Sequence, residues 1–157
     1  PWTFEGRLRT LQNKTLRHPG SFAQLRAFYD LGLWDLTPLQ VGDVEVVPRD
    51  VFHALFEPRV TFAGDKDVVL IRVQAVGKKD GREAEAMVGV IDYLDQETGF
   101  TAMERCTGWS AAIVAEMMAR GQIPPGAGGV ETQVPAGPFV EQLRHRGIDV
   151  TEQVIVK

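Results

Sequence analysis

A polar interruption in the middle of the chain could bind an anion. In TGFTAMERCTGWSAAIVAEMMARG, residues 98–121, the spacing of apolar residues changes at Cys106-Thr107-Gly108 from strand-like alternation to helical periodicity. The Thr107 hydroxyl could cap a helix that begins at Gly108 or Trp109, and the free amides of that helix could hold a carboxylate or a cofactor phosphate. Alternatively, Thr107 only caps the helix and Trp109 only packs.

Cationic side chains gather in a second stretch, KTLRHPG, which contains Lys14, Arg17 and His18. They lie at the end of a segment that reads as extended, just before Pro19-Gly20 and a predicted helix. From the residues alone, a solvated strand end is the simpler interpretation.

Other reactive residue types show no pattern of a site. Cys106 is the single cysteine and has no histidine near it in sequence, so we expect a buried small residue and no disulfide. The three histidines have no metal-ligand spacing, so no metal is expected. The chain also lacks a glycine-rich nucleotide-binding fingerprint between a strand and a helix.

Composition limits the class of protein. The 157 residues are 44% apolar and carry a net charge of −4, with Lys and Arg scattered along the chain. We therefore expect one domain over residues 1–157, with neither nucleic acid nor a membrane as a partner. The single cysteine suits a reducing compartment, so the cytoplasm is the expected location. The start at Pro1 favours a fragment of a longer, two-domain protein over a processed chain.

The apolar pattern predicts the elements that would position these residues. The first predicted helix begins at Ser21, with Gln24 in capping-box spacing, and stops at Gly32. Two more begin at Pro48 and after Thr107, and a last one lies around Phe139 and stops at Gly147. The predicted strands are 44–47, 68–76, 82–93, a third antiparallel strand at 100–103, and 150–156. Asp80-Gly81 predicts a tight hairpin turn between the second and third of these strands. The chain is thus expected to be α+β, with a largely antiparallel or mixed sheet and helices packed on one face.

Three stretches together resemble one known family. KTLRHPG, DQETGFTAMERCTGWSAAIVAEMMARG and FVEQLRHRGI are similar, in order and spacing, to the carboxy-terminal, substrate-binding domain of the saccharopine dehydrogenase and lysine 6-dehydrogenase family. The middle stretch is the most specific. His18, Cys106 and Ser110 depart from the tyrosine, threonine and proline that this family often has, which leaves the substrate open.

The resemblance implies an NAD(P)-dependent oxidoreductase of lysine metabolism that acts at a C–N bond of an amino acid. It implies a fold similar to the carboxy-terminal domain of glyceraldehyde-3-phosphate dehydrogenase, a homodimer, and a Rossmann domain outside this chain that binds most of the NAD or NADP. This fragment alone would then be inactive.

The resemblance also assigns a substrate site. Arg17 would clamp a substrate carboxylate, with Lys14 and His18 beside it, and the helix start at Thr107, Gly108 and Trp109 would face the same cleft. Lys14 and His18 are candidates for proton transfer by their chemistry, but no catalytic residue is identified. The alternative function is a non-catalytic amino-acid-sensing or dimerisation module of the same fold.

Overall fold

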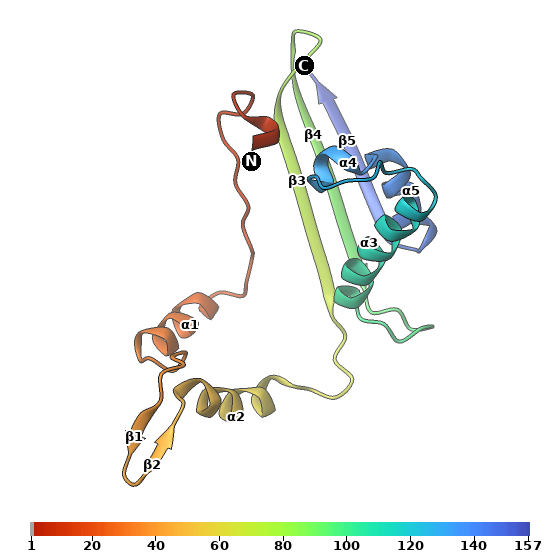
Figure 1. The fold of residues 1–157 in the computed structure, drawn as a ribbon. Helices are drawn as coiled ribbons and strands as arrows, with labels where there is room; N and C mark the ends of the chain where they lie inside the picture. Colours follow the sequence, from red (N-terminus) through yellow and green to blue (C-terminus); the bar gives the residue numbers. More distant parts are fainter. Residues whose placement is uncertain (1) are drawn as a thin grey trace. The chain divides into compact units, whose positions relative to one another are not determined.

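The computed structural model describes residues 2–157 and consists of two compact units (Figure 1). The sheet unit contains Lys66–Lys157 together with residues 2 and 3, and the helical unit is Phe4–Asp65. A short 3-10 helix, η1 (Trp2–Phe4), stands at the boundary between them in sequence.

Three antiparallel strands form the sheet of the sheet unit. They are β3 (Val68–Lys79), β4 (Arg82–Tyr93) and β5 (Asp149–Val156), with β4 in the centre. Asp80 and Gly81 both have positive φ, 53° and 80°, as the predicted hairpin turn requires. The β3–β4 hairpin is therefore confirmed, and β3 runs three residues longer than predicted.

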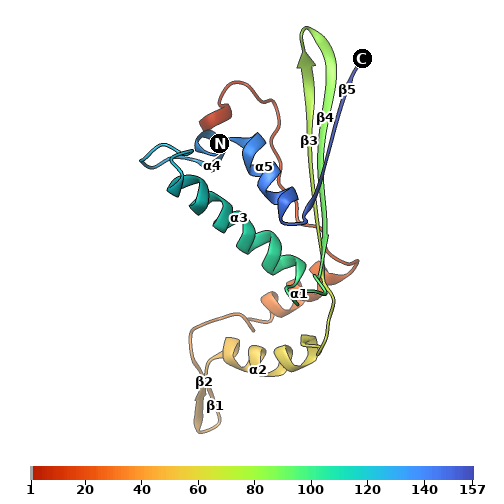
Figure 2. The same ribbon diagram turned by 90° about the vertical axis from the view of Figure 1, so that its right-hand side faces the viewer.

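The helices of this unit lie on one side of the sheet (Figure 2). They are α3 (Ala102–Ala119), α4 (Val130–Gln133) and α5 (Ala136–His145). α3 packs on β3 and β4, whereas α5 packs on β5 and on α3. The core lies between α3 and α5, where buried Ile113, Met117 and Ile123 pack with Trp109 and Phe139.

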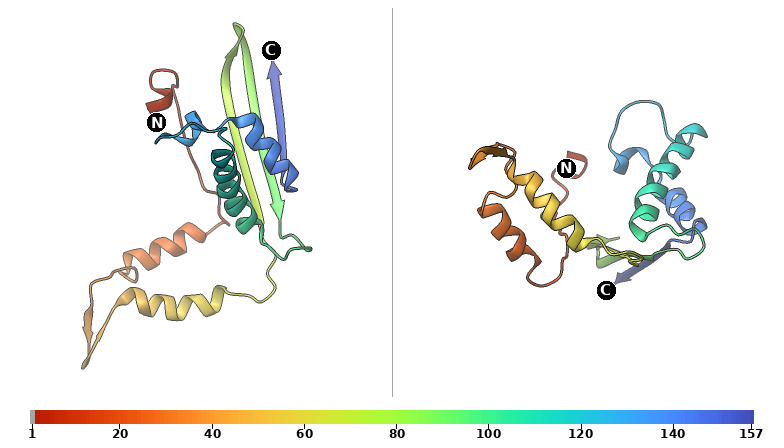
Figure 3. Two further views of the ribbon diagram at one scale, coloured as in Figure 1. Left: turned by 45° about the vertical axis from the view of Figure 1, so that its right-hand side comes forward. Right: turned by 90° about the horizontal axis from the view of Figure 1, so that it is seen from below.

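The helical unit contains two helices and a short hairpin (Figure 3). Its elements are α1 (Ser21–Asp30), β1 (Leu39–Val41), β2 (Val44–Val46) and α2 (Pro48–Val60). Gly32, with φ 79°, ends α1 as predicted, because the amides of Gly32 and Leu33 bind the carbonyls of Tyr29 and Phe28. Pro48 is the first residue of α2, also as predicted.

Aromatic side chains hold α1 and α2 together. The ring centroids of Phe28 and Phe52 are 5.5 Å apart, and those of Phe52 and Phe56 are 4.9 Å apart. Trp34 adds an edge contact to Phe52. Pro48 is nevertheless the one fully buried residue among residues 4–65.

The predicted third strand at residues 100–103 is wrong. Ala102 and Met103 begin α3, and Thr101 is its N-cap residue. Thr101 and Glu104 form a capping box, a T-x-x-E signal that outweighs three residues of apparent alternation. The place beside β4 is taken by β5, which pairs Val150 with Val90.

Two expectations near the N-terminus also need correction. Residues 8–18 form no strand, so Lys14 and Arg17 lie in an irregular segment and not at a strand end. α1 does begin at Ser21, but its N-cap is Gly20, with φ 85°, and no side chain caps it. Because Ser21 is already helical, its side chain is not at the position that a capping box uses.

The fold class is α+β with antiparallel sheets, as expected. None of the helices in residues 2–157 is long and apolar enough to cross a membrane.

Candidate functional site

The cationic segment is exposed to solvent. Lys14, Arg17 and His18 are all exposed, and the turn at Pro19-Gly20 follows them directly. The His18 carbonyl accepts a hydrogen bond from the Ser21 amide at 3.1 Å, which ties the end of the segment to the start of α1. The ion pairs found in the helical unit join Arg26 to Asp30 and His53 to Glu57. Arg17 and Lys14 therefore have no acidic partner among the described residues of their own unit.

Thr107, Gly108 and Trp109 do not form a helix start. They lie in the second turn of α3, where backbone amides are bonded within the helix. The Thr107 hydroxyl contacts Met103 Sδ at 3.7 Å instead of capping amides. Thr107 and Gly108 are exposed, and Trp109 is half-buried.

Trp109 has a packing role. Its side chain joins the core cluster of α3, and the Arg146 guanidinium lies 5.7 Å from its ring centroid. The indole Nε1 is buried without a hydrogen-bond partner among the described protein atoms. The packing interpretation of Trp109 is thus the one that the contacts support.

The true N-terminus of α3 is closed to ligands. The Asp67 carboxylate accepts hydrogen bonds from the amides of Ala102 at 2.6 Å and Met103 at 2.8 Å. The Glu104 amide donates to the Thr101 hydroxyl at 3.1 Å. The Thr101 amide and hydroxyl donate to the Glu104 carboxylate, and these bonds lower the pKa of Glu104. Protein side chains thus occupy the amides that would otherwise bind an anion.

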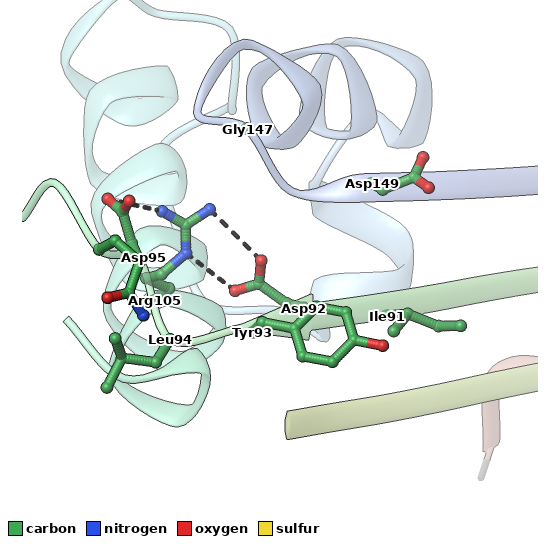
Figure 4. Close-up of a pocket in the computed structure, with 9 residues that line it drawn as sticks. Ile91, Asp92, Tyr93, Leu94, Asp95, Arg105, Gly147 and Asp149 are labelled. Carbon is green, nitrogen blue, oxygen red and sulfur yellow. Dashed lines mark hydrogen bonds and ion pairs between the residues drawn. The ribbon is translucent and has the colours of Figure 1, made fainter. Parts of the chain in front are cut away.

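A buried ion cluster joins α3 to the end of β4 (Figure 4). Arg105 Nε donates to Asp92 Oδ2 at 2.9 Å, and Arg105 Nη1 lies 3.2 Å from Asp95 Oδ2. Arg105 Nη2 reaches Asp92 Oδ1 and the Arg146 carbonyl, both at 3.3 Å. Both Arg105 and Asp92 are almost fully buried, with side chains 10% and 6% exposed. Sequence reasoning missed this cluster.

Two groups of the cluster have pKa values shifted in the direction that keeps each of them charged. Hydrogen bonding to Asp92 raises the pKa of Arg105 above its usual value. The Thr98 hydroxyl, the Glu97 amide and Arg105 lower the pKa of Asp95. Arg105 and Asp95 are therefore both charged at neutral pH, and the Arg105 guanidinium is engaged on three sides.

A shallow pocket of about 640 Å³ opens beside this cluster. Its walls are formed by residues 91–96 together with Arg105, Gly147 and Asp149. Because Asp92, Asp95 and Asp149 outnumber the one guanidinium, the lining is acidic. Arg105 is already bound by two carboxylates, so this pocket does not offer the anion site that the sequence predicts.

Cys106 is unreactive in this setting. Its Sγ lies 3.9 Å from Asp92 Oδ2, and desolvation, followed by the Asp92 charge, raises the pKa of the thiol. A thiol with a raised pKa stays protonated at neutral pH and is a weak nucleophile. Across residues 2–157, no three His, Cys, Asp or Glu side chains are grouped so that they could hold a metal ion.

The sequence model of one known family matches almost the whole chain. This family is described as the saccharopine dehydrogenase C-terminal domain, and the match covers residues 3–148. It includes the cationic segment, the β3–β4 hairpin, α3 and α5. The chain therefore belongs to the saccharopine dehydrogenase C-terminal domain family, a domain of saccharopine dehydrogenase-type oxidoreductases.

Proposed function

We propose that this chain is the substrate-binding half of an NAD(P)-dependent amino-acid oxidoreductase that acts at a C–N bond, of the saccharopine dehydrogenase or lysine 6-dehydrogenase type. The family match supports the reaction class. The observation that carries the site is the exposed Arg17, which has no acidic partner within residues 4–65 and is followed by a turn. A free guanidinium next to an ordered turn suits a substrate carboxylate.

Lys14 and His18 complete the proposed substrate site. Both are exposed within four residues of Arg17, and both can exchange a proton. Lys14 adds positive charge for a second substrate carboxylate or a carbonyl oxygen. The imidazole of His18 carries a ring nitrogen that can take up a proton in general-base catalysis, so it is the better candidate for the base.

The described residues do not fit the pyrophosphate of NAD or NADP. The sheets are antiparallel, so the unit of parallel strand, glycine loop and helix that binds dinucleotides does not occur in residues 2–157. The amides at the start of α3 are taken by Asp67 and Thr101. We therefore place cofactor binding mainly in a domain outside this chain; when bound there, the nicotinamide supplies the hydride chemistry.

Calorimetric titration of the 157-residue chain with NAD and with NADP tests the cofactor assignment. We expect no binding tighter than about 1 mM, because residues 2–157 contain no parallel strand, glycine loop and helix to hold the phosphates. A dissociation constant in the low micromolar range would place the cofactor site in this chain and overturn the assignment.

Replacing Arg17 in the full-length enzyme tests the substrate site. Losing one partner of a desolvated charge pair costs about 2–5 kcal/mol, so Arg17→Ala should lower kcat/KM for the amino-acid substrate by roughly 30-fold to several thousand-fold. Arg17→Lys should recover part of this, because an ammonium cannot form two parallel bonds.

Arg26→Ala is the matched control. Arg26 is an exposed arginine of the same unit and is paired with Asp30 on α1, so its loss should leave kcat/KM within about twofold. Near-normal kcat/KM of the Arg17→Ala enzyme would contradict the assignment. So would an Arg17→Ala enzyme that is inactive because it no longer shows a folding transition on heating.

A non-catalytic amino-acid-sensing or dimerisation module remains the second candidate. It is favoured by burial within the unit that carries the cationic segment: no Asp, Glu, His, Lys or Arg side chain of residues 4–65 is buried, whereas catalytic acids and bases usually have pKa values shifted by burial. Turnover of the full-length protein with NAD(P) and lysine or saccharopine separates the two, because a sensing module would bind the amino acid without forming reduced cofactor. We expect turnover in this assay. We also propose that the protein is cytoplasmic, binds an amino acid, and has no nucleic-acid or membrane partner.

A further inference from the structure

The three-stranded sheet ends in two edge strands that differ in how their unpaired backbone groups are protected. β4 lies in the centre, so β3 and β5 each have a neighbouring strand on one side alone (Figure 1). In an antiparallel pair, alternate residues point both backbone groups at the partner strand, and the residues between them point theirs away. The outward groups of an edge strand are a template on which another strand can add.

The edge of β5 is protected by a side chain. The Lys157 amide donates to the Glu83 carbonyl at 2.8 Å, so the odd-numbered residues of β5 face β4 and the even-numbered residues face outward. The outward carbonyl of Val150 accepts hydrogen bonds from Arg144 Nη2 at 2.8 Å and Nε at 3.3 Å. Arg144 also pairs with Glu152, the next outward residue, at 2.9 Å. A strand that added to β5 would have to displace this guanidinium.

The edge of β3 has no such protection from the described residues of the sheet unit. The Leu94 amide donates to the Asp67 carbonyl at 3.4 Å, one position before β3, so the odd-numbered residues of β3 face β4. The N–H and C=O groups of its even-numbered residues therefore face outward, and no described residue of this unit forms a hydrogen bond with them. We call these groups the free edge of β3. They belong to Val68, Leu70, Arg72, Gln74, Val76 and Lys78.

β3 also lacks the features that usually block strand addition. It has 12 residues against the 8 of β5, and it contains no proline. Its register with β4 is unbroken, so it has no bulge. Lys78 and Lys79 stand at the hairpin end, and Arg72 is the one charged residue between Val68 and Val76. The free edge is therefore long, regular and open.

An added strand would cover exposed apolar side chains on both faces of β3. On the face toward α3, Ile71 and Val73 are 46% and 57% exposed. On the opposite face, Leu70 and Val76 are 67% and 75% exposed. Because burial of apolar surface is favourable, apolar side chains on the added strand would contribute to binding.

Arg72 indicates the charge of the added strand. Its side chain is exposed and pairs with no carboxylate among the described residues of the sheet unit. Its neighbours on the same face are Leu70 and Gln74 on β3 and Gly89 on β4, none of which is acidic. A carboxylate directly opposite Arg72 on a fourth strand would pair with this guanidinium.

We propose that the free edge of β3 binds an extended peptide segment of another polypeptide, which adds to the sheet as a fourth, antiparallel strand. The segment has apolar residues at alternate positions and a carboxylate opposite Arg72. Hydrogen bonds to the outward backbone groups of β3 supply the affinity, and the side-chain pairs select the sequence. The interaction is independent of the proposed oxidoreductase activity, and its tests need no turnover.

A synthetic peptide tests the assignment on the full-length protein. The probe is an acetylated and amidated peptide of alternating threonine and valine, with a glutamate in place of the central threonine. We expect calorimetry to give a dissociation constant of about 10–100 μM. With the peptide at about ten times that constant, hydrogen exchange at the amides of Leu70, Arg72 and Gln74 should slow about tenfold. The outward amides of β5 should be unchanged, because Arg144 protects that edge.

Proline substitution gives matched variants on the two edges. The Gln74 N–H faces the free edge and is not used between β3 and β4, so Gln74→Pro should leave the hairpin folded. It removes one donor and places the ring against the added strand, so the dissociation constant should rise at least about tenfold. Glu152→Pro makes the same change at an outward residue of β5 and should alter the constant less than about twofold. Circular dichroism checks that both variants fold.

Charge exchange keeps the test decisive if a proline variant does not fold. Arg72→Glu should weaken binding of the glutamate peptide about fivefold. A peptide with lysine in place of the glutamate should bind the Arg72→Glu protein more tightly than it binds the wild type. A lysine peptide that binds both proteins equally would contradict the pairing with Arg72.

Four results would overturn the free edge of β3 as a peptide site. The first is no binding at about 1 mM peptide. The second is protection of the outward amides of β5 in place of those of β3. The third is unchanged binding by a folded Gln74→Pro protein. The fourth is protection of the outward β3 amides without peptide, because another part of the protein or a second copy would then occupy the edge.

Discussion

The sheet unit and the helical unit differ in how much they bury. Apart from Pro48, the buried apolar residues of the described chain belong to the sheet unit: Ala102, Ile113, Met117, Ile123, Ile148 and Val150. The helical unit buries Pro48 alone and depends on half-exposed aromatic contacts. Burial of apolar surface is the main stabilising term, so the stability of the chain resides chiefly in the sheet unit.

The difference separates stability from the proposed substrate site. In the sheet unit, which has the core, Arg105 is already paired with Asp92 and Asp95, and the first turn of α3 is capped by protein side chains. The unit without such a core carries Arg17 with its guanidinium available. Regions of low local stability are where ligand-binding segments are usually found.

The largest expected effect comes from breaking the buried ion cluster. Arg105→Ala leaves the carboxylate of Asp92, which is 5% exposed, without its cation, and should lower the free energy of unfolding by about 3–5 kcal/mol. Urea denaturation measures it. Arg26→Ala removes an exposed pair of the helical unit and should cost at most about 0.5 kcal/mol. Equal losses for the two variants would contradict the contrast between the units.

A core truncation should have the next largest effect. Ile113 is fully buried, so Ile113→Ala should cost about 2–5 kcal/mol through lost burial and the cavity left behind. Leu55 on α2 is 56% exposed, and Leu55→Ala should cost less than about 1 kcal/mol. If Leu55→Ala proved as costly as Ile113→Ala, α2 would be buried in the protein in solution and the contrast would fail.

Asp67 connects the start of the sheet unit to α3, and its loss should have a moderate effect. Asp67→Ala removes the acceptor of the Ala102 and Met103 amides and should cost about 0.5–2 kcal/mol, as the loss of a helix cap does. Asp65→Ala, two residues earlier and exposed, serves as the control and should be nearly neutral. A neutral Asp67→Ala would show that water caps α3 as well as the carboxylate does.

Local signals in the sequence were enough to predict most elements. The Asp80-Gly81 turn, the helix stops at Gly32 and Gly147, and Pro48 at the start of α2 are properties of adjacent residues, and the structure has all of them. The start of α3 was also readable, from the capping-box spacing of Thr101 and Glu104. It was missed because residues 100–103 also alternate like a strand.

Pairings between distant residues could not be predicted in the same way. β5 pairs with β4 across some 60 positions of sequence, and no local pattern distinguishes it from residues 100–103 as the partner. The Arg105–Asp92 pair likewise depends on the register that brings α3 over β4. One indication existed: Val88, Val90 and Asp92 share a face, so a carboxylate stands where the core-facing pattern calls for an apolar residue.

The smallest expected effect is a pH dependence that belongs to the cap of α3. The hydrogen bonds from the Thr101 amide and hydroxyl lower the pKa of Glu104 in the folded state below its unfolded value of about 4.3. A carboxyl group with a lowered folded pKa stabilises the fold above its unfolded pKa, and this contribution is lost as the pH falls through the folded pKa. The urea midpoint of the wild-type chain should therefore exceed that of Glu104→Gln at about pH 6, and this difference in midpoint should narrow below about pH 4.

Glu57→Gln in the helical unit, where Glu57 is exposed and faces His53, gives the comparison variant. A gap for Glu104→Gln that stays constant from about pH 6 to pH 3 would mean that the glutamine amide replaces the ionised carboxylate in the capping box, and that the charge of Glu104 contributes nothing to the stability of the sheet unit.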